Sequence, residues 1–235
     1  MIIESINNTK IKEFTKLHQK KYRDQSAKFL ICDNDLALKY RSLATNAFSL
    51  EFENENTCLV NKQVIDKLSN GYDTANVLVM DKFNYTFSNE EKIIILDDVA
   101  DPNNIGLILK AMVFYHYDLL VLSPNCADIY SQKIINRAKD AFMKIKFIET
   151  DILTFTENLK NLGYGIYATG LNHISKELKD VVPCQKHALI LGNEGHGVSE
   201  KLMNISDEVI KIDMKNLDSL NVAMAGTIVM HHFNK

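Results

Sequence analysis

Hydrophobic and polar positions follow a mixed pattern in the first third of the chain. Ile11, Phe14 and Leu17 recur at helical spacing among lysines, which predicts an amphipathic helix over 10–21. Short apolar runs predict strands at 28–32, 47–52, 57–60 and 75–80, with helices expected at 34–44 and 61–71. The polar segment 81–91 has neither the helical period nor the alternating period of a strand, and it is expected to be a linker. The pattern predicts a small mixed α/β domain over residues 1–88.

From residue 92 the pattern becomes regular. Continuous apolar strands are expected at 92–99, 118–123, 145–149, 164–170, 188–192 and 208–212, with helices between them and a last helix from about Asp218. Strands that are apolar on both faces and alternate with helices indicate a parallel sheet covered on both sides. The predicted fold class is therefore α/β, with a C-terminal parallel-sheet domain over residues 92–235.

Composition narrows the class of protein. The chain has 235 residues, of which 46% are hydrophobic and 24% charged, as in an ordinary globular protein. No apolar run reaches the roughly 18 residues of a spanning helix, and the N-terminus lacks the apolar core of a signal peptide. We therefore expect a cytoplasmic protein with no membrane partner. The four cysteines are scattered without metal-ligand spacing, so no metal is expected.

Charge is unevenly distributed. The net charge is −3, yet residues 10–28 carry seven basic residues and two acidic ones, a local balance of 7 − 2 = +5. Such a patch can neutralise phosphates even in an acidic chain, and Lys20, Lys21 and Arg23 are its candidate RNA ligands. The solvated face of a surface helix is the alternative explanation of the same pattern.

Three loops that follow strands carry the candidate chemistry. In parallel sheets, ligands bind beyond the carboxyl ends of the strands. Residues 100–106 follow the first strand and lead into a helix that carries Lys110. A loop with three glycines in six residues, 192–197, follows the strand 188–191. Either loop alone would be an ordinary turn, but both should meet at one edge of the sheet.

The third loop, 213–225, follows the strand 208–212 at the same edge. Asp218 or Ser219 is the expected N-cap of the last helix. Asn221 would then lie in the first helical turn, where asparagine is a poor helix former unless its amide has a partner. The convergence of the three loops predicts a binding site.

The motifs in these loops resemble those of a known family. D-P-x-N-x-G (101–106), L-G-x-E-G-x-G (191–197) and S-L-N-V-x-x-A (219–225) resemble the three motifs of the SpoU/TrmH family of RNA ribose 2′-O-methyltransferases. The resemblance covers about 97–235. More loosely, S-I-N-N-x-K-I-K near the N-terminus resembles the RNA-binding domain of the ribosomal-RNA branch. The resemblance implies a trefoil knot, S-adenosylmethionine as cofactor, a homodimer whose active site uses both subunits, and RNA as substrate, ribosomal rather than transfer RNA.

The resemblance also implies roles for individual residues. Lys110 stands where the family has an arginine assigned to proton uptake, and lysine loses a proton more readily than arginine. Asn104, Ser219 and Asn221 would orient the RNA, with Glu194 fixing the loop or the RNA and Arg137 binding a phosphate. The cofactor would be held by Thr169, Gly192, Asn193, Gly195, Ile212, Met214 and Leu220.

Several residues depart from the family pattern. Besides Lys110, they are Cys32-Asp33 in place of Glu-Gly, Lys139 and Ala141 in place of Ser and Gly, His116 in place of a helix-closing glycine, and 212–216, which lacks the usual proline and glycine. These departures keep open a second hypothesis, a catalytically weak or inactive RNA-binding module that retains the fold. A dinucleotide-dependent oxidoreductase is disfavoured, because the first strand of the sheet lacks a G-x-G-x-x-G turn.

Overall fold

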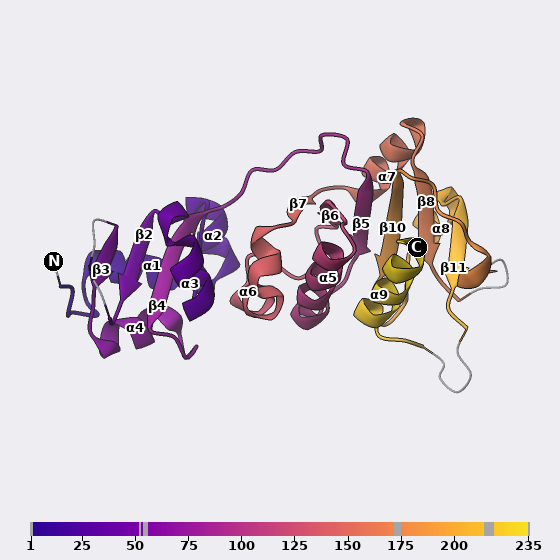
Figure 1. Ribbon diagram of the computed structural model, residues 1–235. Coiled ribbons are helices and arrows are strands. Elements are labelled where there is room, and N and C mark those ends of the chain that lie inside the picture. The colour runs from indigo at the N-terminus through magenta and orange to yellow at the C-terminus, as the bar shows by residue number, and fades with distance from the viewer. Residues whose placement is uncertain (1, 52, 54–55, 172–174, 214–218, 235) are drawn as a thin grey trace. The chain divides into compact units, whose positions relative to one another are not determined.

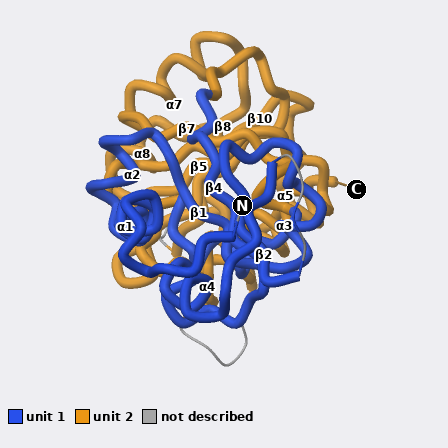
Figure 2. The backbone as a smooth tube through the Cα atoms, turned by 90° about the vertical axis from the view of Figure 1, so that its left-hand side faces the viewer, with its two compact units in different colours: residues 1–84, 130–140 blue, residues 85–129, 141–235 orange. Residues whose placement is uncertain are grey.

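The computed structural model of the chain describes residues 2–51, 53, 56–171, 175–213 and 219–234. It divides into two compact units, which Figure 2 shows in different colours. The first unit comprises residues 1–84 and 130–140, and the second comprises 85–129 and 141–235. The division after residue 84 lies in the segment expected to be a linker. Residues 130–140 belong to the first unit by their contacts, although the sequence assigned them to the second domain.

The first unit contains a four-stranded mixed sheet, which confirms the mixed α/β prediction. The strand order is β1-β4-β2-β3, with β4 antiparallel to β1 and β2, and β2 parallel to β3. The strands are β1 (Lys28–Ile31), β2 (Asn46–Ser49), β3 (Thr57–Leu59) and β4 (Asn76–Asp81). The α-helices are α1 (Thr9–Thr15), α2 (Lys20–Ser26), α3 (Asn34–Tyr40), α4 (Lys62–Ser69) and α6 (Gln132–Ala138). Short 3-10 helices cover Lys16–His18 and Arg41–Leu43.

The helix expected over 10–21 is broken at Gln19, whose backbone is extended (φ −102°, ψ 132°). The break turns Arg23 inward. Its side chain is buried, with 5% of the residue exposed, and its Nη1 donates a hydrogen bond to the carbonyl of Leu17 at 2.7 Å. This corrects the interpretation of Arg23 as an RNA ligand, because its guanidinium is used inside the unit. Lys20 and Lys21 remain exposed.

The second unit is built on a seven-stranded sheet in which every neighbouring pair is parallel, as predicted (Figure 1). The order is β7-β6-β5-β10-β8-β11-β9. The strands are β5 (Lys92–Asp97), β6 (Leu119–Leu122), β7 (Lys146–Glu149), β8 (Gly165–Thr169), β9 (Lys176–Glu177), β10 (His187–Gly192) and β11 (Glu208–Lys211). The direction in which strands are added reverses between β5 and β10. The trefoil knot remains a prediction from the resemblance.

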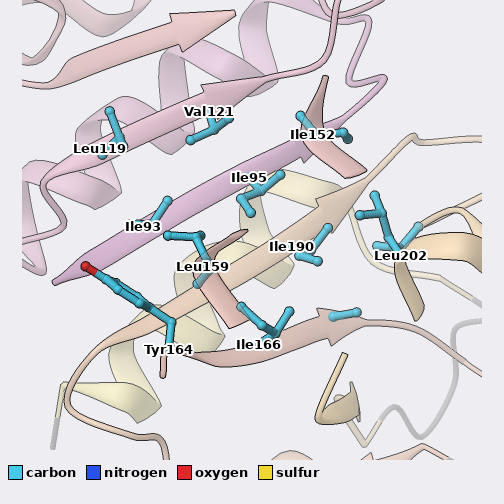
Figure 3. Packing of buried hydrophobic residues seen from close by; sticks show 13 residues of the cluster. Ile93, Ile95, Leu119, Val121, Ile152, Leu159, Tyr164, Ile166, Ile190 and Leu202 are labelled. Atoms are coloured by element: carbon cyan, nitrogen blue, oxygen red, sulfur yellow. The ribbon is translucent and has the colours of Figure 1, made fainter. Parts of the chain in front are cut away.

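Helices cover both faces of this sheet. They are α5 (Pro102–Phe114), α7 (Ile152–Asn161), α8 (Glu200–Ile205) and α9 (Val222–Phe233), with 3-10 turns at Lys139–Met143 and Leu178–Asp180. On one face, side chains of β5, β6, β8 and β10 pack against α7 and α8 (Figure 3). On the other, α9 lies so close to β10 that a Cβ added to Gly226 would be 2.6 Å from Leu191 Cδ1. α5 packs beside α9.

The start of the second unit is fixed by a buried carboxylate. Glu90, with 6% of its side chain exposed, accepts hydrogen bonds from the backbone N–H and hydroxyl of Ser88 and from Lys146 Nζ, at 2.7–2.8 Å. Burial raises the pKa of Glu90, but these hydrogen bonds outweigh it and lower the pKa to about 2. The segment before β5 is thereby attached to β7.

This carboxylate predicts a dependence of stability on pH. Because the folded pKa lies below the ordinary value of 4.5, Glu90 stabilises the fold above pH 4.5. That contribution is lost as the pH falls from about 4.5 towards about 2. We expect Glu90→Gln to lower the free energy of unfolding at pH 7 and to weaken its decline in acid, as measured by urea unfolding. The exposed Glu157 provides the control, Glu157→Gln. An unchanged acid profile in Glu90→Gln would contradict this assignment.

Candidate active site

A pocket of about 450 Å³ opens at the carboxyl ends of β8, β10 and β11. It lies beside the point where the strand order reverses, which is where open parallel sheets bind ligands. Its lining comes from five parts of the chain: Thr169, Gly170 and Leu171; Gly192, Asn193, Glu194, Gly195, His196, Gly197 and Val198; Met203; Ile210, Lys211 and Ile212; and Ser219, Leu220, Asn221, Val222 and Ala225.

The glycine loop 192–197 forms a closed turn along one side of the pocket. The backbone groups of Asn193 and Gly197 bond to each other in both directions, at 3.1 and 2.9 Å. Gly197 has φ +72°, and a Cβ on Gly192 would lie 2.1 Å from the backbone of Gly197. Asn193 accepts a hydrogen bond from the N–H of Gly195 at 2.7 Å. The glycines therefore allow a turn that no larger residue could form at position 192.

Two adjacent aspartates at the end of β5 support this loop, one through its backbone carbonyl and the other through its carboxylate. The carbonyl of Asp98 accepts a hydrogen bond from Asn193 Nδ2 at 2.7 Å, and Asp97 Oδ2 accepts one from the N–H of Ser199 at 2.7 Å. Asp98 is left-handed (φ +57°), and its Oδ1 accepts a hydrogen bond from the Ser123 hydroxyl at 2.6 Å. The sequence analysis missed this support. Two acids directly after an apolar strand were the available signal.

Asn104 joins all three loops. Its residue is 4% exposed, its Nδ2 donates to Glu194 Oε1 at 2.7 Å, and its Oδ1 accepts a hydrogen bond from Asn221 Nδ2 at 2.9 Å. Asn104 follows β5, Glu194 follows β10 and Asn221 follows β11. The three loops therefore converge at one edge of the sheet.

Asn221 is the N-cap of α9, which corrects the expectation of a cap at Asp218 or Ser219. Its Oδ1 accepts hydrogen bonds from the N–H groups of Ala223 and Met224, at 3.0 and 3.3 Å. Both ends of the Asn221 amide therefore have partners, as expected: its oxygen bonds to the start of α9, and its nitrogen donates to Asn104. Asp218 lies outside the described residues, and Ser219 lines the pocket.

Most of the residues expected to hold the cofactor line this one pocket. They are Thr169, Gly192, Asn193, Gly195, Ile212 and Leu220. Met214 lies outside the described residues. The pocket also has contributions from Leu171, His196 and Met203, which the sequence analysis did not single out.

Lys110 lies apart from the pocket. It is exposed on α5 and is not among the residues that line the cavity of its own chain. His116, which follows α5, has φ +56°. This is a conformation that favours glycine, so the glycine usual at this position in relatives has a backbone reason.

Arg137 is exposed on α6 in the first unit. Two other departures from the family pattern, Asp33 and Lys139, have a structural explanation. The ammonium of Lys139 forms an ion pair with the buried carboxylate of Asp33. Asp33 replaces a glycine, and Lys139 replaces a serine. The two departures are therefore partners in one contact.

The family model described as the SpoU rRNA Methylase family matches residues 91–231, well over half of the chain. The chain belongs to this family. The predicted family is thereby confirmed, and with it an RNA methyltransferase function. A curated relative, the 23S rRNA (guanosine(2553)-2′-O)-methyltransferase RlmP of Bacillus subtilis, is 26% identical over 98% of each chain.

Solved structures show the same fold over nearly the whole chain. An AdoMet-bound rRNA methyltransferase from Sinorhizobium meliloti has a TM-score of 0.89 at 20% identity, with 99% of this chain and 97% of that chain covered. The SpoU methyltransferase AviRb from Streptomyces viridochromogenes, in complex with AdoMet, has a TM-score of 0.81 at 16% identity, with 97% and 98% covered. At such identities the likeness shows the fold alone. Among the described residues, none of the helices is both long and apolar enough to cross a membrane.

The two pocket glycines are expected to differ in their tolerance of a side chain. Gly192→Ala should lower the free energy of unfolding by about 1–3 kcal/mol, because its Cβ would overlap the backbone of Gly197. Gly195→Ala is the matched control, since its Cβ would approach only Asn193 Oδ1, at 3.3 Å, and should change stability by less than about 0.5 kcal/mol. Urea unfolding of both variants measures the difference, and equal stabilities would contradict the described turn.

Proposed function

We propose that the chain is an S-adenosylmethionine-dependent methyltransferase that acts on a ribose 2′-hydroxyl of ribosomal RNA. One observation carries the proposal: two of the three motif loops line the pocket, and the buried Asn104 of the third bonds to both of them. The name of the Bacillus subtilis relative, and the AdoMet in the two solved structures, point to the same substrate and cofactor.

The pocket suits S-adenosylmethionine. Ile212 and Leu220 offer apolar side chains for the faces of an adenine ring, and the backbone of 192–197 offers polar groups for its edge. The absence of a side chain at Gly195 leaves that backbone accessible. Thr169 stands at the end of the neighbouring strand. When bound, the cofactor would supply an electrophilic methyl group.

The chain's own residues would align the ribose with that methyl group. Ser219 and Asn221 line the pocket, and the buried Asn104 holds Asn221 and Glu194 in place. Fixed polar groups of this kind convert a bimolecular step into a positioned one. We infer that Ser219 and Asn221 orient the 2′-hydroxyl and its phosphate, while Glu194 maintains the loop.

Lys110 would take up the proton of the ribose 2′-hydroxyl as the oxygen bonds to the methyl carbon and the bond between that carbon and the cofactor's sulfur breaks. Its exposure, away from the pocket of its own chain, is the reason to assign it to the pocket of a second copy. On α5, Lys110 shares a face with Phe114, which is 73% exposed. Met224, 56% exposed, and Ile228 share a face of the adjacent α9. Exposed apolar side chains on neighbouring helices favour a protein interface, so we propose a homodimer.

The first unit would bind the RNA substrate. We propose residues 1–88 as the RNA-binding domain and 92–235 as the methyltransferase domain. Lys20 and Lys21 are exposed in the basic segment, and Arg137 is exposed on α6. These cations would contact the phosphates of the RNA. We propose that the protein acts in the cytoplasm, where ribosomes are found. Arg23 is excluded from this set by its burial.

The alternative of a weak RNA-binding module depends on Lys110, so substitutions there test the function. Lys110→Met keeps the length of the side chain but removes its basicity, and should reduce single-turnover methylation by roughly 100-fold or more. Lys110→Arg should retain activity if the site accepts the family's residue. Full activity in Lys110→Met would overturn the catalytic assignment, and no turnover in the wild type with any ribosomal RNA would favour the binding module.

A shared active site predicts complementation between two inactive variants. Lys110→Met lacks the base, and Gly195→Val fills the space beside the glycine loop. In a mixed dimer, the pocket of the first variant would receive Lys110 from the second. Coexpression should restore about a quarter of wild-type activity, because half of the randomly formed dimers are mixed and each has one intact site. Either variant alone is the control. Absence of recovery in dimers shown to be mixed would contradict a shared site.

A further inference from the structure

The first unit contains a second pocket, of about 220 Å³, which the proposed reaction does not use. It lies among α1, the 3-10 helix Lys16–His18, α2 and the start of β1. Phe14, Leu17 and Tyr22 provide apolar surface, and the polar residues of its lining are Glu13, Lys16, Gln25, Ser26 and Lys28. Its volume is about half that of the pocket in the second unit, enough for a small flat ring rather than a whole cofactor.

Tyr22 is the feature that gives this pocket a chemical character. Its ring is half-buried and packs against the core of the unit. The ammonium groups of Lys16 and Lys21 lie 5.5 and 5.9 Å from its centre. An aromatic ring beside exposed cations combines a stacking surface for a base with charges for the flanking phosphates. The local balance of +5 over residues 10–28 gives the same sign of charge to the surrounding segment.

Glu13 is unexpected in such a basic segment. It is exposed at the rim and, within the described residues, forms no ion pair with the lysines around it. A carboxylate would repel a phosphate, so it does not serve the backbone of an RNA. It can accept hydrogen bonds from an exocyclic amino group on the edge of a base. Gln25, on the same pocket, offers both a donor and an acceptor.

We propose that this pocket binds one unpaired nucleobase of the RNA substrate, stacked on Tyr22, with its amino group facing Glu13 and its phosphates held by Lys16 and Lys21. The inference rests on the proposed function in assuming that the substrate is RNA. It specifies an unpaired base with an exocyclic amino group, which adenine, cytosine and guanine have and uracil lacks. Single-stranded segments are where proteins read RNA bases by stacking and by hydrogen bonds to their edges.

The stacking is tested with the full-length chain and short single strands of adenosine, cytidine or uridine, by fluorescence anisotropy over a range of salt. Tyr22→Leu should weaken binding of the first two strands roughly 5- to 100-fold, without changing the salt slope. Tyr22→Phe should bind like the wild type. Tyr72→Leu is the matched control, because Tyr72 packs against the same core without lining the pocket. An equal loss in Tyr22→Leu and Tyr72→Leu, or no loss in a folded Tyr22→Leu, would overturn the proposal.

The charged residues have separate signatures. Lys16→Met should flatten the salt slope by about 0.7, the value for one phosphate contact with a single strand. The wild type should prefer adenosine and cytidine strands to uridine, and Glu13→Gln should reduce that preference. Equal affinity of the wild type for all three strands would overturn the role of Glu13. The measurements on the wild type, Lys16→Met and Glu13→Gln test the proposal even if Tyr22→Leu fails to fold.

The failure of this inference is distinguishable from failure of the proposed function. Suppose that Tyr22→Leu methylates RNA with unchanged KM and kcat and binds RNA with unchanged affinity. This result would contradict the base pocket but not the proposed methyltransferase function. RNA binding that depends on Tyr22, without methylation of any RNA, would support the base pocket and contradict the proposed methyltransferase function. A raised KM with unchanged kcat in Tyr22→Leu is the expected result, because the pocket lies outside the reacting groups.

Discussion

The hydrogen bonds of Asn104 are the constraint on which the candidate active site depends. One buried amide uses its N–H group for Glu194 and its carbonyl for Asn221, and so joins loops that follow three different strands. The amide nitrogen of Asn104 donates hydrogen bonds and its oxygen accepts them. The carboxylate of Glu194 can only accept, so it must face the nitrogen, and the donor of Asn221 must face the oxygen. One side chain at the start of α5 therefore holds Glu194 and Asn221, which both line the pocket, in fixed relative positions. Asn193 and the carbonyl of Asp98 add a second connection between the first two loops.

The sheet explains why such a connection is possible. β8, β10 and β11 are neighbours in the parallel sheet, so the segments that follow them lie at the same edge and line one pocket. Helices on both faces close the remaining surfaces. The family's three motifs are far apart in the sequence because they follow β5, β10 and β11, yet they occupy adjacent positions in the fold.

Periodicity predicted six of the seven strands of the parallel sheet, because strands buried on both faces have continuous apolar runs. It missed β9, a two-residue edge strand (Lys176–Glu177) with no apolar residue. It failed where a single residue changed the backbone. The helix expected over 10–21 breaks at Gln19, and Arg23 turns inward to a carbonyl that no pattern reveals. The site was predictable as a set of loops, through the motifs. The partnership of Asn221 with Asn104 was not, because a contact across more than a hundred residues leaves no trace in local spacing.

The ion pair between Asp33 and Lys139 has a consequence for how this protein can be recombined with its relatives. The first unit is discontinuous, since 130–140 belongs to it by contact and lies within the methyltransferase part of the sequence. A chimera that received only residues 1–84 from a relative would place a foreign residue opposite Lys139. The reciprocal chimera, with residues 1–84 of this chain, would leave the buried carboxylate of Asp33 without its cation. Viable exchanges of the first unit must therefore carry both segments, so the natural module boundary in this chain is a pair of breakpoints rather than one.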